Sequence, residues 1–142
     1  MARKKREYKL SKDIALDEFD RWLEAMDIDD DPEGMTDDDI RAFENQKRKL
    51  VEAIRRGALV INEDGLAVYT PQNEKSKNQD PLTFNERTGA SVMAMDRHKK
   101  NHDVAKTYAI MAGMCGVHQK VFAGMVGIDA KICEAIFALL MD

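Results

Sequence analysis

Carboxylate side chains gather in one short segment, and their spacing is the first pattern in the chain that could support chemistry. Asp29, Asp31 and Glu33 stand at alternate positions, as in the first half of an EF-hand calcium loop, and a glycine follows them. The position that should supply the bidentate glutamate is Ile40, which has no oxygen ligand to offer. We therefore predict a solvated acidic loop between two helices and no specific calcium site.

The other patterns that could hold a metal or carry catalysis are weaker. His98 and His102 stand four residues apart, a spacing that can place two zinc ligands on one helix face. The residues between them include Lys-Lys-Asn, which indicates a break in the helix, and no third ligand is nearby. The sequence contains no P-loop, dinucleotide-binding, nucleophile-elbow, zinc-protease or Cys-x-x-Cys motif. We expect a protein that is not an enzyme and that binds no cofactor or metal.

The two cysteines, Cys115 and Cys133, stand among Met, Gly, Ala and Ile residues, and neither has a close partner in the sequence. Buried free thiols in a reducing compartment are the simplest interpretation. The basic first residues are followed by no apolar core, unlike a secretory signal, and no run approaches the roughly 18 apolar residues of a membrane span. We expect a cytoplasmic protein that does not enter the membrane.

Charge is distributed unevenly along the chain, whose net charge is −4. Residues 13–39 contain thirteen acidic side chains and a single base, Arg21. Residues 3–6 read Arg-Lys-Lys-Arg, which could contact phosphates, an acidic protein surface, or the acidic segment of the same chain. The acidic balance argues against a general nucleic-acid binder, which would present a basic surface.

Hydrophobic periodicity predicts a mainly α fold of the α+β class: a small helical domain with one β-hairpin and an acidic helical N-terminal extension. Helices are predicted over residues 13–26 and 37–56, the second capped by Thr36 and stopped at Gly57. Two β-branched runs around a turn that ends in Gly65 predict the hairpin. The expected segments are an acidic helical region at 1–57, the hairpin at 58–70, a polar linker at 71–81 and a C-terminal helical region at 82–142.

The C-terminal region is rich in Met, Ala and Gly, and no acid, base or nucleophile recurs in it at catalytic spacing. Six of the nine methionines stand at residue 93 or later. Methionine at helical spacing is more often core than binding surface, yet Met combined with Gly also makes an adaptable surface for flexible apolar segments. The elements expected here are a short strand near 82–84, a helix from Thr88 to about Arg97, a helix starting at 101 or 103, a helical turn at 118–123, and a last helix capped by Asp129.

Residues 86–96, ERTGASVMAMD, resemble a segment of the tail assembly chaperones of Mu-like and related tailed phages. In that family a short strand leads into a helix that ends near an Ala-Met-Asp, and a helix, a short turn and a final helix follow. The sequence AIMAGMCGVHQKVFAGMVGIDAKICEAIFALLMD has the same layout. It departs from the family pattern at Met125 and Val126, which replace the usual leucine before the last helix. Residues 1–57 have no obvious counterpart in the family.

The resemblance implies a non-enzymatic binder that coats the apolar, helical tape measure protein of a phage tail before the tail tube protein assembles. It implies a homo-oligomer, because a long client needs many copies, and a location in the host cytoplasm. An alternative is a small helical regulatory or nucleic-acid-associated protein that uses residues 3–6 and the bases of the 37–56 helix. The residues hypothesised to bind the client are Met93, Met95, Tyr108, Met111, Met114, Phe122, Met125, Ile132, Ile136 and Leu140.

Overall fold

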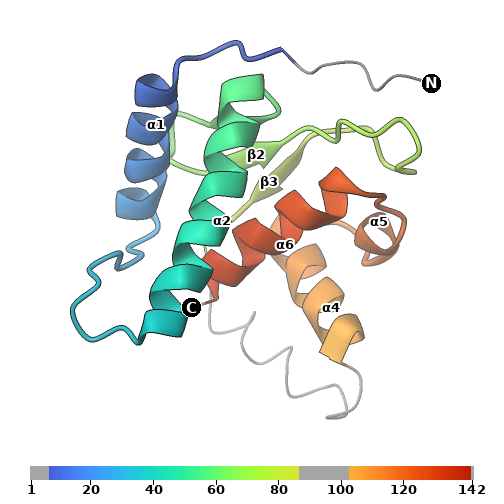
Figure 1. Cartoon of the computed structure of the whole chain (residues 1–142). Helices are drawn as coiled ribbons and strands as arrows, with labels where there is room; N and C mark the ends of the chain where they lie inside the picture. Colours follow the sequence, from blue (N-terminus) through green and yellow to red (C-terminus); the bar gives the residue numbers. More distant parts are fainter. Residues whose placement is uncertain (1–6, 87–102, 142) are drawn as a thin grey trace.

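A computed structural model describes residues 7–86 and 103–141 of the chain (Figure 1). Within these residues the fold is mainly helical with one small antiparallel sheet, which confirms the predicted fold class. The elements are α1 Lys12–Ala25, α2 Asp37–Arg56, β1 Leu59–Ile61, β2 Ala67–Tyr69, β3 Leu82–Phe84, α4 Asp103–Cys115, α5 Lys120–Ala123 and α6 Ile128–Leu140. The helix expected from residue 88 to 97 lies outside the described residues.

The ends of α2 are fixed by the capping groups that the sequence predicts. The Thr36 hydroxyl accepts a hydrogen bond from the Asp39 amide at 3.1 Å, and the Asp39 carboxylate accepts one from the Thr36 amide at 3.2 Å. Gly57 ends the helix in the left-handed conformation, with φ of 81°. These bonds satisfy backbone groups that a helix end otherwise leaves unpaired.

The sheet has the order β1-β2-β3, and all its pairs are antiparallel. Gly65 lies in the predicted hairpin turn with φ of 80°, and a Cβ built there would lie 2.4 Å from the Ala25 Cβ. The turn therefore needs glycine both for its backbone conformation and for its packing against the end of α1. Arg21 of α1 contacts the hairpin at the end of β1. Its guanidinium donates hydrogen bonds to the carbonyl of Ile61 at 2.6 Å and to the carbonyl of Asn62 at 2.9 Å.

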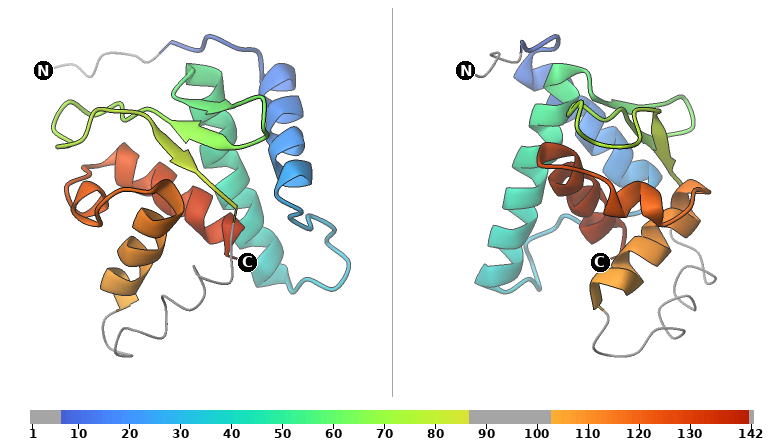
Figure 2. Two further views of the ribbon diagram at one scale, coloured as in Figure 1. Left: turned by 180° about the vertical axis from the view of Figure 1, so that it is seen from behind. Right: turned by 90° about the vertical axis from the view of Figure 1, so that its right-hand side faces the viewer.

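All the elements contribute to one hydrophobic core. α1 lies beside α2, and α6 crosses α2 (Figure 1). The sheet lies behind α2 in Figure 1 and in front of α2 in the view from behind (Figure 2). Buried side chains from Phe19 of α1 to Ile136 of α6 belong to the same apolar cluster. The expected acidic extension, residues 1–57, therefore shares its core with the C-terminal helical region. No helix among the described residues is long and apolar enough to cross a membrane.

Candidate functional site

The side chains hypothesised to bind a client lie mainly inside the domain. Met93 and Met95 fall outside the described residues, and Tyr108 of α4 is half-buried. The seven others do not form an exposed face in this structure, because α4, α5, α6 and the turn between α5 and α6 place these side chains in the shared core; that they bind a client stays a hypothesis. The seven buried residues are Met111, Met114, Phe122, Met125, Ile132, Ile136 and Leu140.

The part of α4 from residue 107 to 115 carries no charge. No residue from Thr107 to Cys115 is ionic, and Gly113 is exposed with open space around its Cα. Tyr108 and Ala109 are half-buried on the same helix, which lies at the periphery of the molecule (Figure 1). In a chain with 34% charged residues, this uncharged and partly exposed stretch of α4 is a candidate for contact with another apolar element.

The most elaborate polar arrangement in the described residues surrounds Asp129 of α6, whose side chain is completely buried. Its Oδ1 accepts hydrogen bonds from the Tyr69 hydroxyl at 2.6 Å and the Gln72 amide at 2.7 Å. Its Oδ2 accepts from the Asn73 amide at 3.0 Å and the Ser76 hydroxyl at 2.6 Å. Four donors thus satisfy a charge that would otherwise be costly to bury.

The Asp129 cluster corrects two predictions. Asp129 does not cap α6, because the helix begins at Ile128 and the position before it is Gly127, which makes no side-chain cap. Residues 71–81 are not a free linker either, because Ser76 is 97% buried and Pro71 is buried. The absence of apolar residues from 72 to 80 indicated mobility, whereas hydrogen bonds to Asp129 hold this loop against the protein.

Both cysteines are free thiols, as predicted. Burial raises the pKa of the Cys115 thiol to about 12. Burial also raises the pKa of Cys133 well above its usual value, and the nearby ionisable groups of Cys115 and Asp129 raise it further. Both thiols are therefore protonated at neutral pH, the form that is a poor nucleophile and a poor metal ligand.

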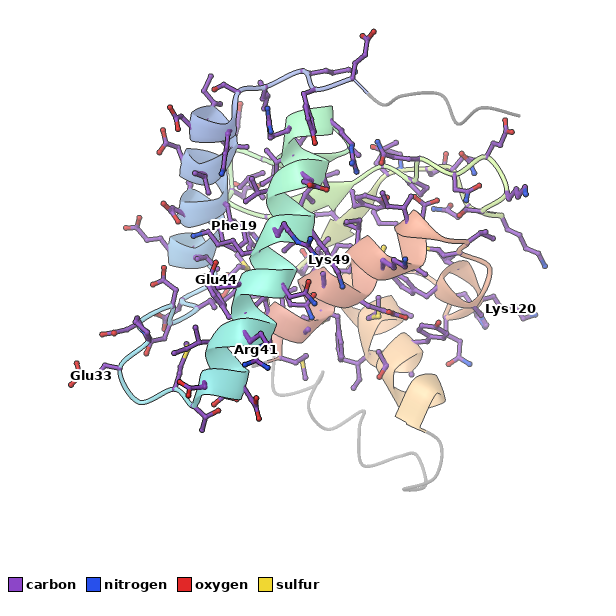
Figure 3. All side chains as sticks on the ribbon, in the orientation of Figure 1. Phe19, Glu33, Arg41, Glu44, Lys49 and Lys120 are labelled. Atoms are coloured by element: carbon purple, nitrogen blue, oxygen red, sulfur yellow. The ribbon has the colours of Figure 1, made fainter. Side chains whose placement is uncertain are left out.

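The acidic loop between α1 and α2 extends away from the body of the molecule, with Glu33 pointing outward (Figure 3). Asp29 and Asp31 turn their carboxylates back on the loop, where each accepts the amide two residues ahead at 2.9 Å. Within residues 7–86 and 103–141, no three His, Cys, Asp or Glu side chains are grouped so that they could hold a metal ion. His98 and His102 lie outside these residues.

A shallow hollow lies on the outer side of α2, where Figure 3 labels Arg41 and Glu44. One helix supplies all of its lining, and the hollow is open to solvent rather than enclosed by a second element. A small-molecule site is usually an enclosed apolar pocket with a few convergent polar groups. This hollow does not have that form. The lining residues are Asp38, Arg41, Ala42, Glu44, Asn45 and Arg48.

The bases at the other end of α2 are engaged within the chain. The Arg55 guanidinium lies 3.8 Å from the centre of the Tyr8 ring, and its Nε donates to the Leu10 carbonyl at 3.3 Å. Arg56 contacts the Glu52 carboxylate at 3.5 Å. These contacts anchor residues 8–10 on the end of α2, so the two arginines serve the fold and are less available to an external phosphate.

Comparison of the chain with family models, with curated protein sequences and with solved structures finds no match. The functional argument therefore depends on the residues and on their geometry.

The Asp129 cluster is the part of the structure that the sequence did not predict. Its members come from β2, the 71–80 loop and α6, and 53 to 60 residues separate the partners that bond through side chains. One signal was present: Asp129 is an acid close to the start of a strongly apolar helix. That position also suits a helix cap, so the sequence pattern alone does not distinguish the two roles.

Proposed function

We propose that this protein is a phage or prophage tail assembly chaperone that binds the apolar, helical tape measure protein and keeps it in solution until the tail tube protein assembles. The observation that carries the proposal is the order of elements after the hairpin. The strand β3 precedes ERTGASVMAMD, α4 stops at Gly116, the short α5 follows, and α6 closes the chain, which is the layout implied by the resemblance. Only the first residue of ERTGASVMAMD lies in the described part of the chain.

The uncharged stretch of α4 at residues 107–115 supports the binding part of the proposal. A helical client with an apolar stripe needs a surface that does not force it to desolvate charges. Around Ala109 and Gly113 the small side chains allow a partner helix to approach α4 closely. In the closed molecule, where the methionine stripe is buried, this surface is the region where we place the client.

The charge distribution supports the second part, which is keeping a bound client in solution. Exposed carboxylates cover the outer side of α1 and the loop after it, at Asp13, Asp17, Asp20 and Glu24 and beyond. A surface with a large net charge of one sign resists association between complexes. The acidic N-terminal region therefore faces water while α4 lies at the opposite side of the molecule (Figure 1).

Charge placed on α4 tests the proposal directly. In a pull-down of a phage tape measure protein, we expect Ala109→Glu to reduce binding at least tenfold, because the client would have to bury a charge. The matched control is Ala138→Glu, which adds the same charge to an exposed position of α6. Equal binding by both variants and the unaltered protein would place the client elsewhere, and no binding by the unaltered protein would reject the function.

Salt separates this proposal from the alternative, a nucleic-acid-associated protein. Binding through many phosphate contacts weakens by roughly a thousandfold or more between 50 and 200 mM salt, whereas burial of apolar surface is not screened. We expect binding to the tape measure protein that tolerates salt and no measurable binding to duplex DNA at physiological salt. The intramolecular contacts of Arg55 and Arg56 favour this outcome.

A further inference from the structure

Hydrogen bonds attach the loop between β2 and β3 to the turn between α5 and α6 and to Asp129. Residues 72–80 contain no apolar side chain, so burial of apolar surface contributes little to holding them. Three of the four donors to Asp129 come from this loop, namely the amides of Gln72 and Asn73 and the hydroxyl of Ser76. Loss of this one carboxylate would release the loop at three points together.

The loop also bonds directly to the turn it covers. The Ser76 hydroxyl accepts a hydrogen bond from the Val126 amide at 3.0 Å, and the Lys77 amide donates to the Gly124 carbonyl at 3.2 Å. The two glycines of the turn let the loop approach: a Cβ on Gly124 would lie 3.2 Å from Lys77, and one on Gly127 would lie 3.3 Å from Asn73. Figure 1 shows the loop beside α5 and the start of α6.

Residues 117–126, which we call the α5 corner, lie between two glycines with positive φ. These are Gly116, at 67°, and Gly127, at 58°, and a residue of this kind can absorb a change of backbone direction. The corner buries Phe122 against the Phe84 ring, with 6.2 Å between ring centres, and Met125 against the Cys133 sulfur at 3.4 Å. An outward movement of the corner would therefore expose apolar and sulfur-containing surface.

We propose that the 71–80 loop is a latch and that the α5 corner is a cover that opens when the latch is released. Asp129 holds the latch closed, and the opened corner presents Phe122 and Met125 to an apolar helical partner. The identity of that partner rests on the proposed chaperone function, whereas the opening itself does not. This arrangement explains how side chains that are buried in the closed molecule become part of a client-binding surface.

Hydrogen exchange on the full chain tests the opening without any partner. In Ser76→Ala, we expect the amides of Gln72, Asn73 and Val126 to exchange about ten- to a hundredfold faster, the range that one hydrogen bond to a charged group is worth. The amides of α2 should keep their rates. Ser11→Ala is the matched control, because Ser11 also receives a backbone amide bond, from Ile14 at 3.3 Å, but lies at the start of α1.

Two further readouts complete the test. The dye ANS should bind more strongly to Ser76→Ala than to Ser11→Ala, and tape measure protein should bind several-fold more tightly to Ser76→Ala, because more of the protein is already open. Equal acceleration of exchange in α2 and in the α5 corner would overturn the latch, since opening would then require global unfolding. Local opening with unchanged affinity for a client that does bind would overturn the role of the corner. If the tape measure protein binds neither the unaltered protein nor Ser76→Ala, the chaperone function is rejected. The exchange and ANS results then test the latch without it.

Discussion

Replacement of Asp129 by asparagine should destabilise the domain by an amount that the hydrogen-bond geometry allows us to estimate. The amide keeps one acceptor oxygen and places an NH2 group where the other oxygen was. The hydroxyls of Tyr69 and Ser76 can rotate to accept from this group, but backbone amides cannot. Because Gln72 donates to one carboxylate oxygen and Asn73 to the other, either orientation of the asparagine leaves one buried backbone N–H facing a donor.

An unpaired buried N–H costs about 1–3 kcal/mol, and bonds to the remaining neutral oxygen lose about 1 kcal/mol of charge assistance each. Removal of the buried charge returns part of this free energy, because a carboxylate is costly to desolvate. We expect a net loss of about 2 kcal/mol in the free energy of unfolding, out of the 5–15 kcal/mol typical of a domain. The melting temperature should fall by about 4–8 °C.

Urea denaturation at pH 7, followed by circular dichroism at 222 nm, measures this loss as a shift of the midpoint at constant slope. Asp20→Asn is the control, because it removes the same charge from an exposed position of α1 and should change the free energy by no more than about 0.5 kcal/mol. If the two variants are equally stable, the four hydrogen bonds do not stabilise the fold and the reasoning fails.

Three further predictions follow from the backbone and from the thiols. Gly65→Ala should cost about 2–3 kcal/mol in urea denaturation, because it combines positive φ with the close approach to Ala25, and a loss below 1 kcal/mol would show that the turn adjusts freely. Thr36→Ala should cost about 1 kcal/mol and reduce hydrogen-exchange protection in the first turn of α2; unchanged protection would contradict the capping role. Between pH 9 and 12 the unfolded chain loses the Cys115 proton first, since burial raises the folded pKa from 9.0 to about 12. As the pH rises through this range, the free energy of unfolding should therefore fall more steeply in the unaltered protein than in Cys115→Ser, by up to about 1.4 kcal/mol per pH unit. Parallel plots of the free energy of unfolding against pH for the two proteins would refute this.

The local elements were predictable because their signals lie within a few residues of one another. Thr36 and Asp39 form a capping box from adjacent turns, and Gly57 and Gly65 mark backbone positions that only glycine adopts easily. The hairpin and the strand at 82–84 follow from β-branched and alternating residues. In each case the physical cause is local, so the order of residues is sufficient.

The long-range features could not be predicted in the same way. An apolar stripe on α4 or α6 predicts that something covers it, but the pattern is the same whether the cover is a client or other elements of the same chain, here β3 and α5 for α4 and α2 for α6. The structure assigns Ile136 and Met111 to the core of the domain. Asp129 illustrates the same limit for a polar group, because its donors come from a loop more than 50 residues earlier in the chain.

The contact of Arg21 with the hairpin has a consequence for how the edge of the sheet meets other molecules. β1 is an edge strand, and the exposed carbonyls of an edge can accept a strand from another molecule. The guanidinium donates to the carbonyls of Ile61 and Asn62, and the nitrogen that bonds to Ile61 also contacts the Glu18 carboxylate at 2.6 Å. A bulky, charged group therefore stands where an incoming strand would have to pair, which disfavours pairing of β1 with a strand of another molecule.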